Sequence, residues 1–137
     1  MNAILSLLIP ALIIVESGGN VQAIGDNGRA VGCLQIHAEC VQDVNRVEGT
    51  AYTVADRADR QKSEEICRAY LTHYGIAYRR RTGKEPTAEV LARIWNGGPR
   101  GYKNPKTARY WAKVKAELTR RATARKIASH SPKKRKP

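Results

Sequence analysis

The stretch Ile13-Ile14-Val15-Glu16-Ser17-Gly18-Gly19 ends a long apolar run and places a single carboxylate at its end. Apolar neighbours and the negative end of a helix dipole both disfavour the ionised form of Glu16, so they raise its pKa. A carboxyl with a raised pKa is suited to act as a general acid. The two glycines also fit an ordinary helix stop, where a Glu serves only solubility. The stretch therefore predicts a helix end and indicates one catalytic candidate.

The residues that precede Glu16 predict a buried helix. Residues 2–15 carry no charge and the first Lys or Arg is Arg29, so the basic start of a signal peptide is missing. The run is also short of the roughly 20 apolar residues that a membrane span needs. We expect no clear cleavable signal peptide and no stable membrane insertion, with cleavage or tethering as the alternative. Pro10 is expected either to open the last turns of this helix or to kink it.

The remaining pattern predicts a mostly helical α+β fold. Gly25-Asp26-Asn27-Gly28 is a turn signature and predicts a small irregular β-hairpin. Helical spacing and helix-start residues predict four further helices. These are His37–Val47, Asp59–Arg81, a helix that starts at Thr87 and ends at Asn96-Gly97-Gly98-Pro99, and a last helix from Asn104-Pro105 with the apolar stripe Tyr110, Trp111, Val114 and Leu118.

The charge is concentrated at the end of the chain. The protein has 25 Lys and Arg against 12 Asp and Glu, and no acidic residue follows Leu118. We therefore divide it into a catalytic domain, residues 1–118, and a basic tail, residues 119–137, which is helical at first and disordered at its end. A plain solvated tail is one interpretation, and attraction to anionic wall polymers is another. No helix with base-reading side chains is evident, so we expect no nucleic-acid partner.

The cysteines do not indicate a metal site. Cys33, Cys40 and Cys67 are odd in number and irregular in spacing, and His37 and His73 do not complete a zinc pattern. We expect no metal and no cofactor. One disulfide with a free thiol, or three reduced thiols, both remain open.

Three segments in order carry a family resemblance: Glu16-Ser17-Gly18, then Gly32-Cys33-Leu34-Gln35-Ile36, then Ile94-Trp95-Asn96-Gly97-Gly98-Pro99. Over about residues 9–118 they resemble the lysozyme-like superfamily, in particular SLT-like lytic transglycosylases with the pattern E-S-G, G-x-x-Q-I and Y-N-A-G. The end of the domain is similar to invertebrate-type lysozymes, whose A-R-I-H-N-G-G-P-x-G and Y-W-x-K-V runs are nearly matched by Ala92–Gly101 and Tyr110–Val114. The chain differs by having Trp95 in place of the transglycosylase Tyr and by having few cysteines.

The resemblance implies roles for individual residues. Glu16 would be the catalytic acid and then the base, since cleavage of a glycosidic bond needs both actions. Ser17 would position Glu16, although a helix-end cap is the alternative. Gln35 would face the sugar cleft, although it also fits an exposed loop residue. The family positions matched by Asn96, its neighbour Gly97, and Tyr110 bind sugar or contact the acid, whereas a turn and a core tyrosine are the alternatives.

Asp26 is the candidate for a second catalytic carboxylate. It is the only acidic residue between Glu16 and Glu39, and Asp26-Asn27-Gly28 lies nine residues before Gln35, near the D-x-G run of invertebrate-type lysozymes. A hydrolase needs such a group, whereas a transglycosylase uses the 6-hydroxyl of the sugar itself. Asp before Asn-Gly is also favoured turn chemistry in any protein.

The resemblance implies an enzyme that cleaves the MurNAc-β-1,4-GlcNAc bond of peptidoglycan. We expect it to act at the bacterial cell wall, secreted or phage-delivered, as a monomer on glycan strands. The E-S-G-G-N opening and the few cysteines favour a lytic transglycosylase with Glu16, and a lysozyme-type hydrolase with Glu16 and Asp26 is the alternative. A non-catalytic glycan-binding or virion-structural module that keeps the fold is a second alternative.

Overall fold

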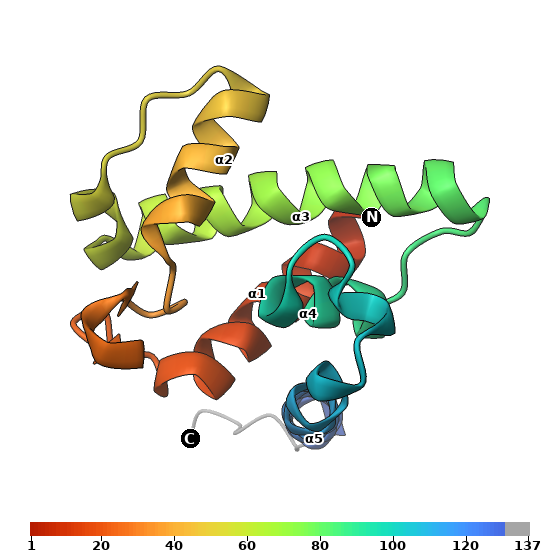
Figure 1. The fold of residues 1–137 in the computed structure, drawn as a ribbon. Helices are drawn as coiled ribbons and strands as arrows, with labels where there is room; N and C mark the ends of the chain where they lie inside the picture. Colours follow the sequence, from red (N-terminus) through yellow and green to blue (C-terminus); the bar gives the residue numbers. More distant parts are fainter. Residues whose placement is uncertain (131–137) are drawn as a thin grey trace.

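The computed structural model describes residues 1–130 (Figure 1). Its main elements are α1 (Asn2–Ser17), β1 (Ile24–Gly25), β2 (Ala30–Val31), α2 (Ala38–Glu48), α3 (Arg60–Thr82), α4 (Ala88–Gly97) and α5 (Ala108–His130). Short 3-10 helices fill the connections at η1 (Asp26–Gly28), η2 (Val54–Ala58), η3 (Gly101–Lys103) and η4 (Pro105–Thr107). The predicted mostly helical α+β class with one small hairpin is confirmed. The predicted disordered end of the tail, 131–137, lies outside the described residues.

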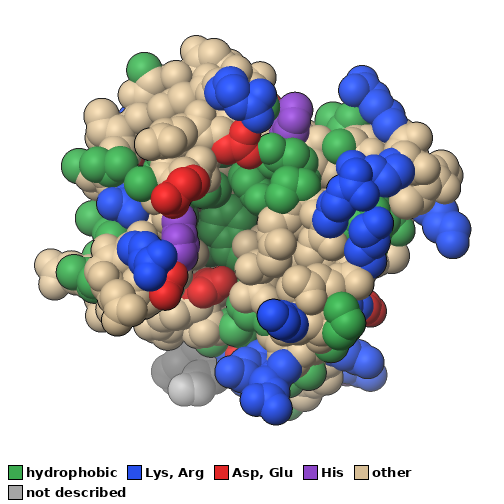
Figure 2. All heavy atoms as spheres, viewed as in Figure 1, with side chains coloured by type: hydrophobic (Ala, Val, Ile, Leu, Met, Phe, Trp, Pro, Cys, Tyr) green, Lys and Arg blue, Asp and Glu red, His purple; other side chains and the backbone are tan. Residues whose placement is uncertain are grey.

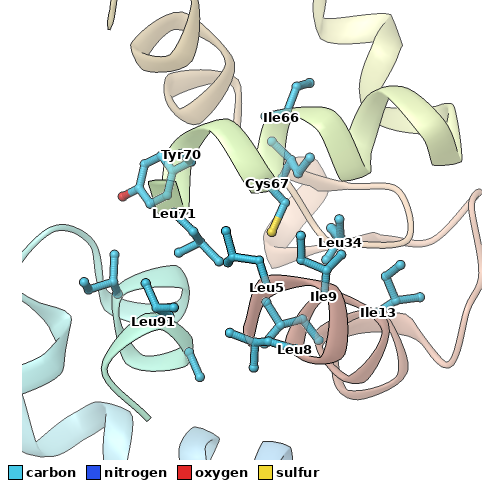
Figure 3. Packing of buried hydrophobic residues seen from close by; sticks show 14 of the residues in the cluster. Leu5, Leu8, Ile9, Ile13, Leu34, Ile66, Cys67, Tyr70, Leu71 and Leu91 are labelled. Carbon is cyan, nitrogen blue, oxygen red and sulfur yellow. The ribbon is translucent and has the colours of Figure 1, made fainter. Parts of the chain in front are cut away.

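Helix α1 forms the centre of the core. Its buried side chains meet those of α3 and α4 in one cluster, as Figure 3 shows for Leu5, Leu71 and Leu91. The helix is continuous through Pro10 and ends at Gly18, whose φ of 64° is the left-handed conformation that stops a helix. The predicted buried helix is thus confirmed. The burial is not complete on every side, because Leu7 and Ile14 are 52% and 39% exposed.

Helices α1 and α5 pack against each other in opposite directions. Tyr110, near the start of α5, reaches Glu16 at the end of α1, and residues from Leu118 to Arg125 lie beside Ile4 and Leu8. Helix α5 therefore passes residue 118 without a break, and the first part of the basic tail lines a groove with α1. Within residues 1–130 no helix is both long and apolar enough to cross a membrane.

The hairpin follows directly after α1. Ile24 pairs with Val31 and Gly25 with Ala30, and Val31 also bridges to Ile36. Asp26 and Asn27 form the predicted turn with φ values of 48° and 55°, a conformation that Asp and Asn tolerate better than most residues. The hairpin turn is thereby confirmed, and it holds the Asp26 side chain at one edge of the molecule.

The predicted helix starts agree with the structure. The Asp59 carboxylate accepts the Lys62 N–H at the start of α3, and the Thr87 hydroxyl accepts the Val90 N–H at the start of α4. Asn104 accepts the Lys106 N–H and opens η4, which leads into α5. These caps satisfy backbone donors that a helix start leaves without partners.

Candidate active site

A cleft of about 440 Å³ lies between the hairpin, the start of α2 and the end of α4. Figure 2 shows this hollow with an apolar floor and with acidic side chains and a histidine along its edge. Four of the predicted site residues line it together, namely Glu16, Asp26, Gln35 and Asn96. The remaining lining residues are Ala30, Ile36, His37, Cys40, Tyr70 and Trp95. The chain thus brings two carboxyl groups from α1 and the hairpin to one cavity.

Glu16 is a carboxyl group of this cleft with a strongly raised pKa. Burial raises its pKa from 4.5 to about 7, while hydrogen bonds from Tyr110 and Trp95 act in the opposite direction. The raised pKa expected from the apolar run is therefore confirmed, and desolvation is its main cause. Near neutral pH the group is divided between its protonated and ionised forms, so it can both donate and accept a proton.

Tyr110 contacts the acid without lining the cleft. Its hydroxyl donates to Oε2 of Glu16 at 2.7 Å, and its pKa is raised by burial and by the neighbouring carboxylate. A hydrogen bond of this kind fixes the carboxyl rotamer and favours the ionised form. Of the family roles considered for Tyr110, contact with the acid is the one that this geometry fits.

A hydrogen-bond network fixes the chain between α4 and α5. The Arg93 guanidinium donates to the Thr107 hydroxyl at 2.8 Å and to the Asn104 carbonyl at 3.1 Å. The buried Thr107 hydroxyl contacts the carbonyl oxygens of Gly101 and Asn104, each at 2.8 Å. The network sets the position at which α5 begins, and with it the position of Tyr110.

Gly97 belongs to this connection rather than to the cleft wall. A Cβ atom at Gly97 would lie 2.5 Å from Cγ2 of Thr107, so the missing side chain permits close packing of α4 on η4. Sequence reasoning places Gly97 among substrate-binding residues, but it is not among the residues that line the cleft. The local geometry instead indicates a packing role.

Asp26 lies on the hairpin side of the same cleft. Its side chain is 51% exposed, and Oδ2 lies 3.3 Å from Nε2 of His37, the residue that precedes α2. This contact joins the hairpin turn to the start of α2 across the cleft edge. A carboxylate at this place can face a sugar bound between the hairpin and α2.

Ser17 and Gln35 use their polar groups inside the protein. The Ser17 hydroxyl contacts the Cys33 carbonyl at 2.8 Å and accepts the Gly19 N–H at 3.2 Å, which ties the end of α1 to the following loop. Nε2 of Gln35 donates to the carbonyls of Ala23 and Gly32. Gln35 lines the cleft, whereas Ser17 does not, and the contacts of the Ser17 hydroxyl lie at the end of α1, directly after Glu16.

One wall of the cleft is aromatic. The Trp95 and Tyr70 rings meet edge to face with centroids 5.6 Å apart, and Tyr74 packs on Tyr70 at 4.7 Å. Asn96 follows Trp95 and has an exposed side chain. An aromatic face next to an exposed amide suits a sugar, which offers apolar C–H surfaces and hydroxyl groups.

Sequence reasoning missed His37, Cys40 and Tyr70 as cleft residues. Tyr70 recurs at helical spacing, which predicts a core residue. It is indeed a core residue and is 9% exposed. The only available signal for His37 was its place after the Gln35-Ile36 pair, at a helix start. Which face of α2 and α3 meets the cleft is decided by packing between helices, and that information is not local.

The three cysteines are free thiols in this structure. Burial raises the pKa of Cys40 to about 12, so its thiol stays protonated although it lines the cleft. Within the described residues, no group of three His, Cys, Asp or Glu side chains is arranged to hold a metal ion. Glu16, Asp26 and His37 also line this cleft.

Two curated proteins are similar to parts of the chain. "Lysozyme 1" of Crassostrea virginica is 48% identical over 44 residues, which are 32% of this chain and 24% of that protein. "Lysozyme" of Magallana gigas is 35% identical over 83 residues, which are 61% of this chain and 56% of that protein. The chain thus spans about a quarter of one relative and about half of the other. No protein-family model matches the chain.

Proposed function

We propose that the protein is a glycosidase that cleaves the MurNAc-β-1,4-GlcNAc bond of peptidoglycan at the bacterial cell wall. The observation that carries this proposal is Glu16, a partly buried carboxyl group that lines an open cleft and has a pKa of about 7. The similarity to two lysozymes supports it. Glycan strands are linear, and a cleft open to solvent is the shape that such a polymer needs.

The reaction begins with proton transfer from Glu16. Its carboxyl protonates the glycosidic oxygen while the bond from that oxygen to C1 breaks, and positive charge develops on the sugar ring. Tyr110 steadies the carboxylate that results, because its hydroxyl already donates to Oε2. Glu16 then takes a proton from the group that attacks C1, either water or a sugar hydroxyl, and returns to its starting form.

The sugar is held by side chains that line the cleft. Trp95 and Tyr70 offer ring faces and edges to the C–H surfaces of the sugar, and the Asn96 amide offers hydrogen bonds to its substituents. Gln35 supports the hairpin that forms the opposite wall, since its Nε2 bonds two backbone carbonyls. Ser17, Gly97 and Tyr110 act indirectly, by holding these elements and the acid in place.

The nature of the attacking group distinguishes two mechanisms. We favour hydrolysis by water, because Asp26 lines the same cleft as Glu16 and His37 holds its carboxylate at the edge. An ionised Asp26 stabilises the positive charge on the sugar or bonds to C1 directly. Attack by the 6-hydroxyl of the sugar, as in a lytic transglycosylase, is the second candidate. The Glu16-Ser17-Gly18-Gly19-Asn20 opening favours it, and it requires no second carboxylate.

Digestion of purified peptidoglycan with product analysis by mass spectrometry tests the proposal. We expect reducing ends from the wild type, a loss of at least about a thousandfold for Glu16→Gln, and a loss of about a hundredfold or more for Asp26→Asn. Glu85→Gln is a matched control, because Glu85 is an exposed acid outside the cleft. Anhydro ends with an active Asp26→Asn variant indicate the transglycosylase instead. A wild type that releases no product, or an active Glu16→Gln variant, contradicts the enzymatic assignment and leaves a glycan-binding or virion-structural module.

The basic end of the chain is proposed to attract anionic wall polymers. Residues 131–137 carry four of the basic residues, Lys133, Lys134, Arg135 and Lys136. Deletion of 131–137 removes these four positive charges and leaves the whole of α5 (Ala108–His130) in the chain. We expect weaker wall binding at low salt, with the difference lost at high salt because the attraction is screened. Equal binding at low salt contradicts this role.

A further inference from the structure

One face of α1 is apolar and exposed, in contrast to the face that forms the core. Leu7 is 52% exposed and Ile14 is 39% exposed. They are seven residues apart, so they project from the same side of the helix. Ala3 is exposed as well, and residues 2–15 contain no charged side chain. We call Ala3, Leu7 and Ile14 the apolar stripe.

The stripe continues into an apolar groove between α1 and α5. The groove has a volume of about 290 Å³, and most of its lining side chains are aliphatic. They are Ile4, Leu7, Leu8, Ala88, Leu118 and Ala122. Two arginines, Arg121 and Arg125, complete the lining from α5. The groove therefore joins an apolar floor to a cationic edge, and Leu7 belongs to both the stripe and the groove.

The charge beside the groove is strongly positive. Helix α5 contains seven Lys and Arg residues and one acidic residue, Glu117. Glu117 is paired with Arg120 at 2.6 Å and lies 4.0 Å from Arg121. Arg125 and Lys126 lie one turn further along and have exposed side chains. The groove edge thus presents cationic groups that its one carboxylate does not neutralise.

We propose that the apolar stripe and the groove dock on the surface of an anionic phospholipid bilayer. A membrane interface offers acyl chains to Leu7 and Ile14 and phosphate groups to the arginines of α5, which is the combination that interfacial helices use. The helix lies in the interface and does not cross it, in keeping with its short apolar length. This docking is separate from the proposed cleavage reaction, because it uses neither Glu16 nor the cleft.

Charge argues against two other occupants. A second copy of the chain packed on this face in a symmetric dimer would bring Arg121 and Arg125 of each copy near those of the other, which like charges oppose. A nucleic acid would match the arginines, but its phosphate backbone makes no use of an apolar stripe. An anionic bilayer is the partner that satisfies both parts of the surface.

The experiment is co-sedimentation of the full chain with vesicles of equal parts phosphatidylglycerol and phosphatidylcholine, compared with vesicles of phosphatidylcholine alone. We expect binding to the anionic vesicles. The double change Leu7→Ser with Ile14→Ser should weaken it about tenfold or more, because the exposed part of both side chains is available for burial in the membrane. Arg121→Gln with Arg125→Gln should weaken it about fivefold for each charge removed.

Matched controls remove side chains of the same kinds, one apolar and two basic, outside the stripe and the groove. Val54→Ser removes a half-exposed apolar side chain from η2. Arg80→Gln with Lys84→Gln removes two exposed charges, one in the last turn of α3 and one just after that helix. These controls should bind vesicles as the wild type does, and circular dichroism checks that every variant is folded. Glu16→Gln should also bind fully. Vesicle binding therefore tests membrane docking independently of whether the protein cleaves peptidoglycan.

Three outcomes overturn the proposal. The first is no binding of the wild type to anionic vesicles. The second is full binding by the Leu7 and Ile14 variant, which would mean adsorption by charge alone. The third is binding to duplex DNA at least as tight as binding to vesicles, with the same loss in the arginine variant, which would identify the surface as a nucleic-acid site. Binding that falls in the Leu7 and Ile14 variant and in the Arg121 and Arg125 variant, and that persists in the controls, supports the proposal.

Discussion

The Tyr110 hydroxyl lies 2.7 Å from Oε2 of Glu16, across a separation of 94 positions in the chain. This hydrogen bond joins the start of α5 to the end of α1. It lowers the pKa of a carboxyl that burial raises, so the net value of about 7 reflects a balance between the two effects. Changes on α5 can therefore alter the acid without touching the cleft.

Tyr110→Phe should raise the pKa of Glu16 further above 7, because it removes a hydrogen bond to the ionised form. We expect the alkaline limb of the pH profile of peptidoglycan cleavage to move upward by up to about one pH unit. The measurement is kcat/KM against pH. Tyr78→Phe is the control, since the Tyr78 ring packs on Tyr102 rather than on Glu16. An unchanged profile for Tyr110→Phe would show that the hydrogen bond has no influence on the acid.

Glu16→Gln should make the protein more stable at alkaline pH. The pKa of Glu16 is about 7 when folded and has an ordinary value of 4.5. Below pH 4.5 the group is protonated in both states and costs little. As pH rises toward and through 7 the unfolded chain gains from ionisation, so stability falls by up to about 3 kcal/mol. Urea unfolding at pH 4 and pH 8 should show a gain of about 1–3 kcal/mol for the variant at pH 8 only. A gain of equal size at both values would assign it to something other than ionisation.

Thr107→Val should destabilise the connection between α4 and α5. The buried hydroxyl contacts the Gly101 and Asn104 carbonyls and accepts the Arg93 N–H, so its loss removes hydrogen bonds from this connection and leaves the Arg93 Nε–H without this acceptor. We expect a loss of about 2–3 kcal/mol in the free energy of unfolding. Thr123→Val, at an exposed position on α5, should change it by no more than about 0.5 kcal/mol. Equal effects of the two changes would count against the network.

Gly32→Ala should disrupt the loop between the hairpin and α2. A Cβ atom at Gly32 would lie 1.7 Å from the Arg57 carbonyl oxygen, and the residue has a φ of 88°. We expect a loss above about 3 kcal/mol, measured by thermal or urea unfolding. Gly28→Ala separates the two causes, since Gly28 has the same φ but no atom within 4 Å of the new Cβ. That control should lose only about 1 kcal/mol, from backbone strain alone. If both variants lost equally, the close approach to Arg57 would not matter.

The elements that could be predicted from sequence are those with local causes. A turn made by Asp26 and Asn27, caps at Thr87 and Asn104, and a stop at Gly18 each depend on a few neighbouring residues, and the structure agrees with them. The raised pKa of Glu16 was also predictable, because an apolar run of 14 residues leaves the following carboxyl poorly solvated.

The elements that could not be predicted depend on contacts between distant segments. The apolar pattern of α1 gives no sign that Leu7 and Ile14 stay exposed while Leu8 and Ile13 are buried, since that depends on where α3, α4 and α5 pack. The network from Arg93 to Thr107 spans 14 positions and requires a loop geometry that spacing does not reveal. For the same reason the contact of Asp26 with His37 was not expected.

The separation of Glu16 and Tyr110 along the chain also has a consequence for biosynthesis. A ribosome releases Glu16 early, but the nascent chain lacks the aromatic wall until α4 has emerged and lacks the Tyr110 hydroxyl until α5 has emerged. The acid therefore reaches its final protonation equilibrium only after the last helix docks. Translation products that stop before residue 110 carry the Glu16 carboxyl without the Tyr110 hydroxyl that donates to it. The site is therefore complete only when α5 has been made.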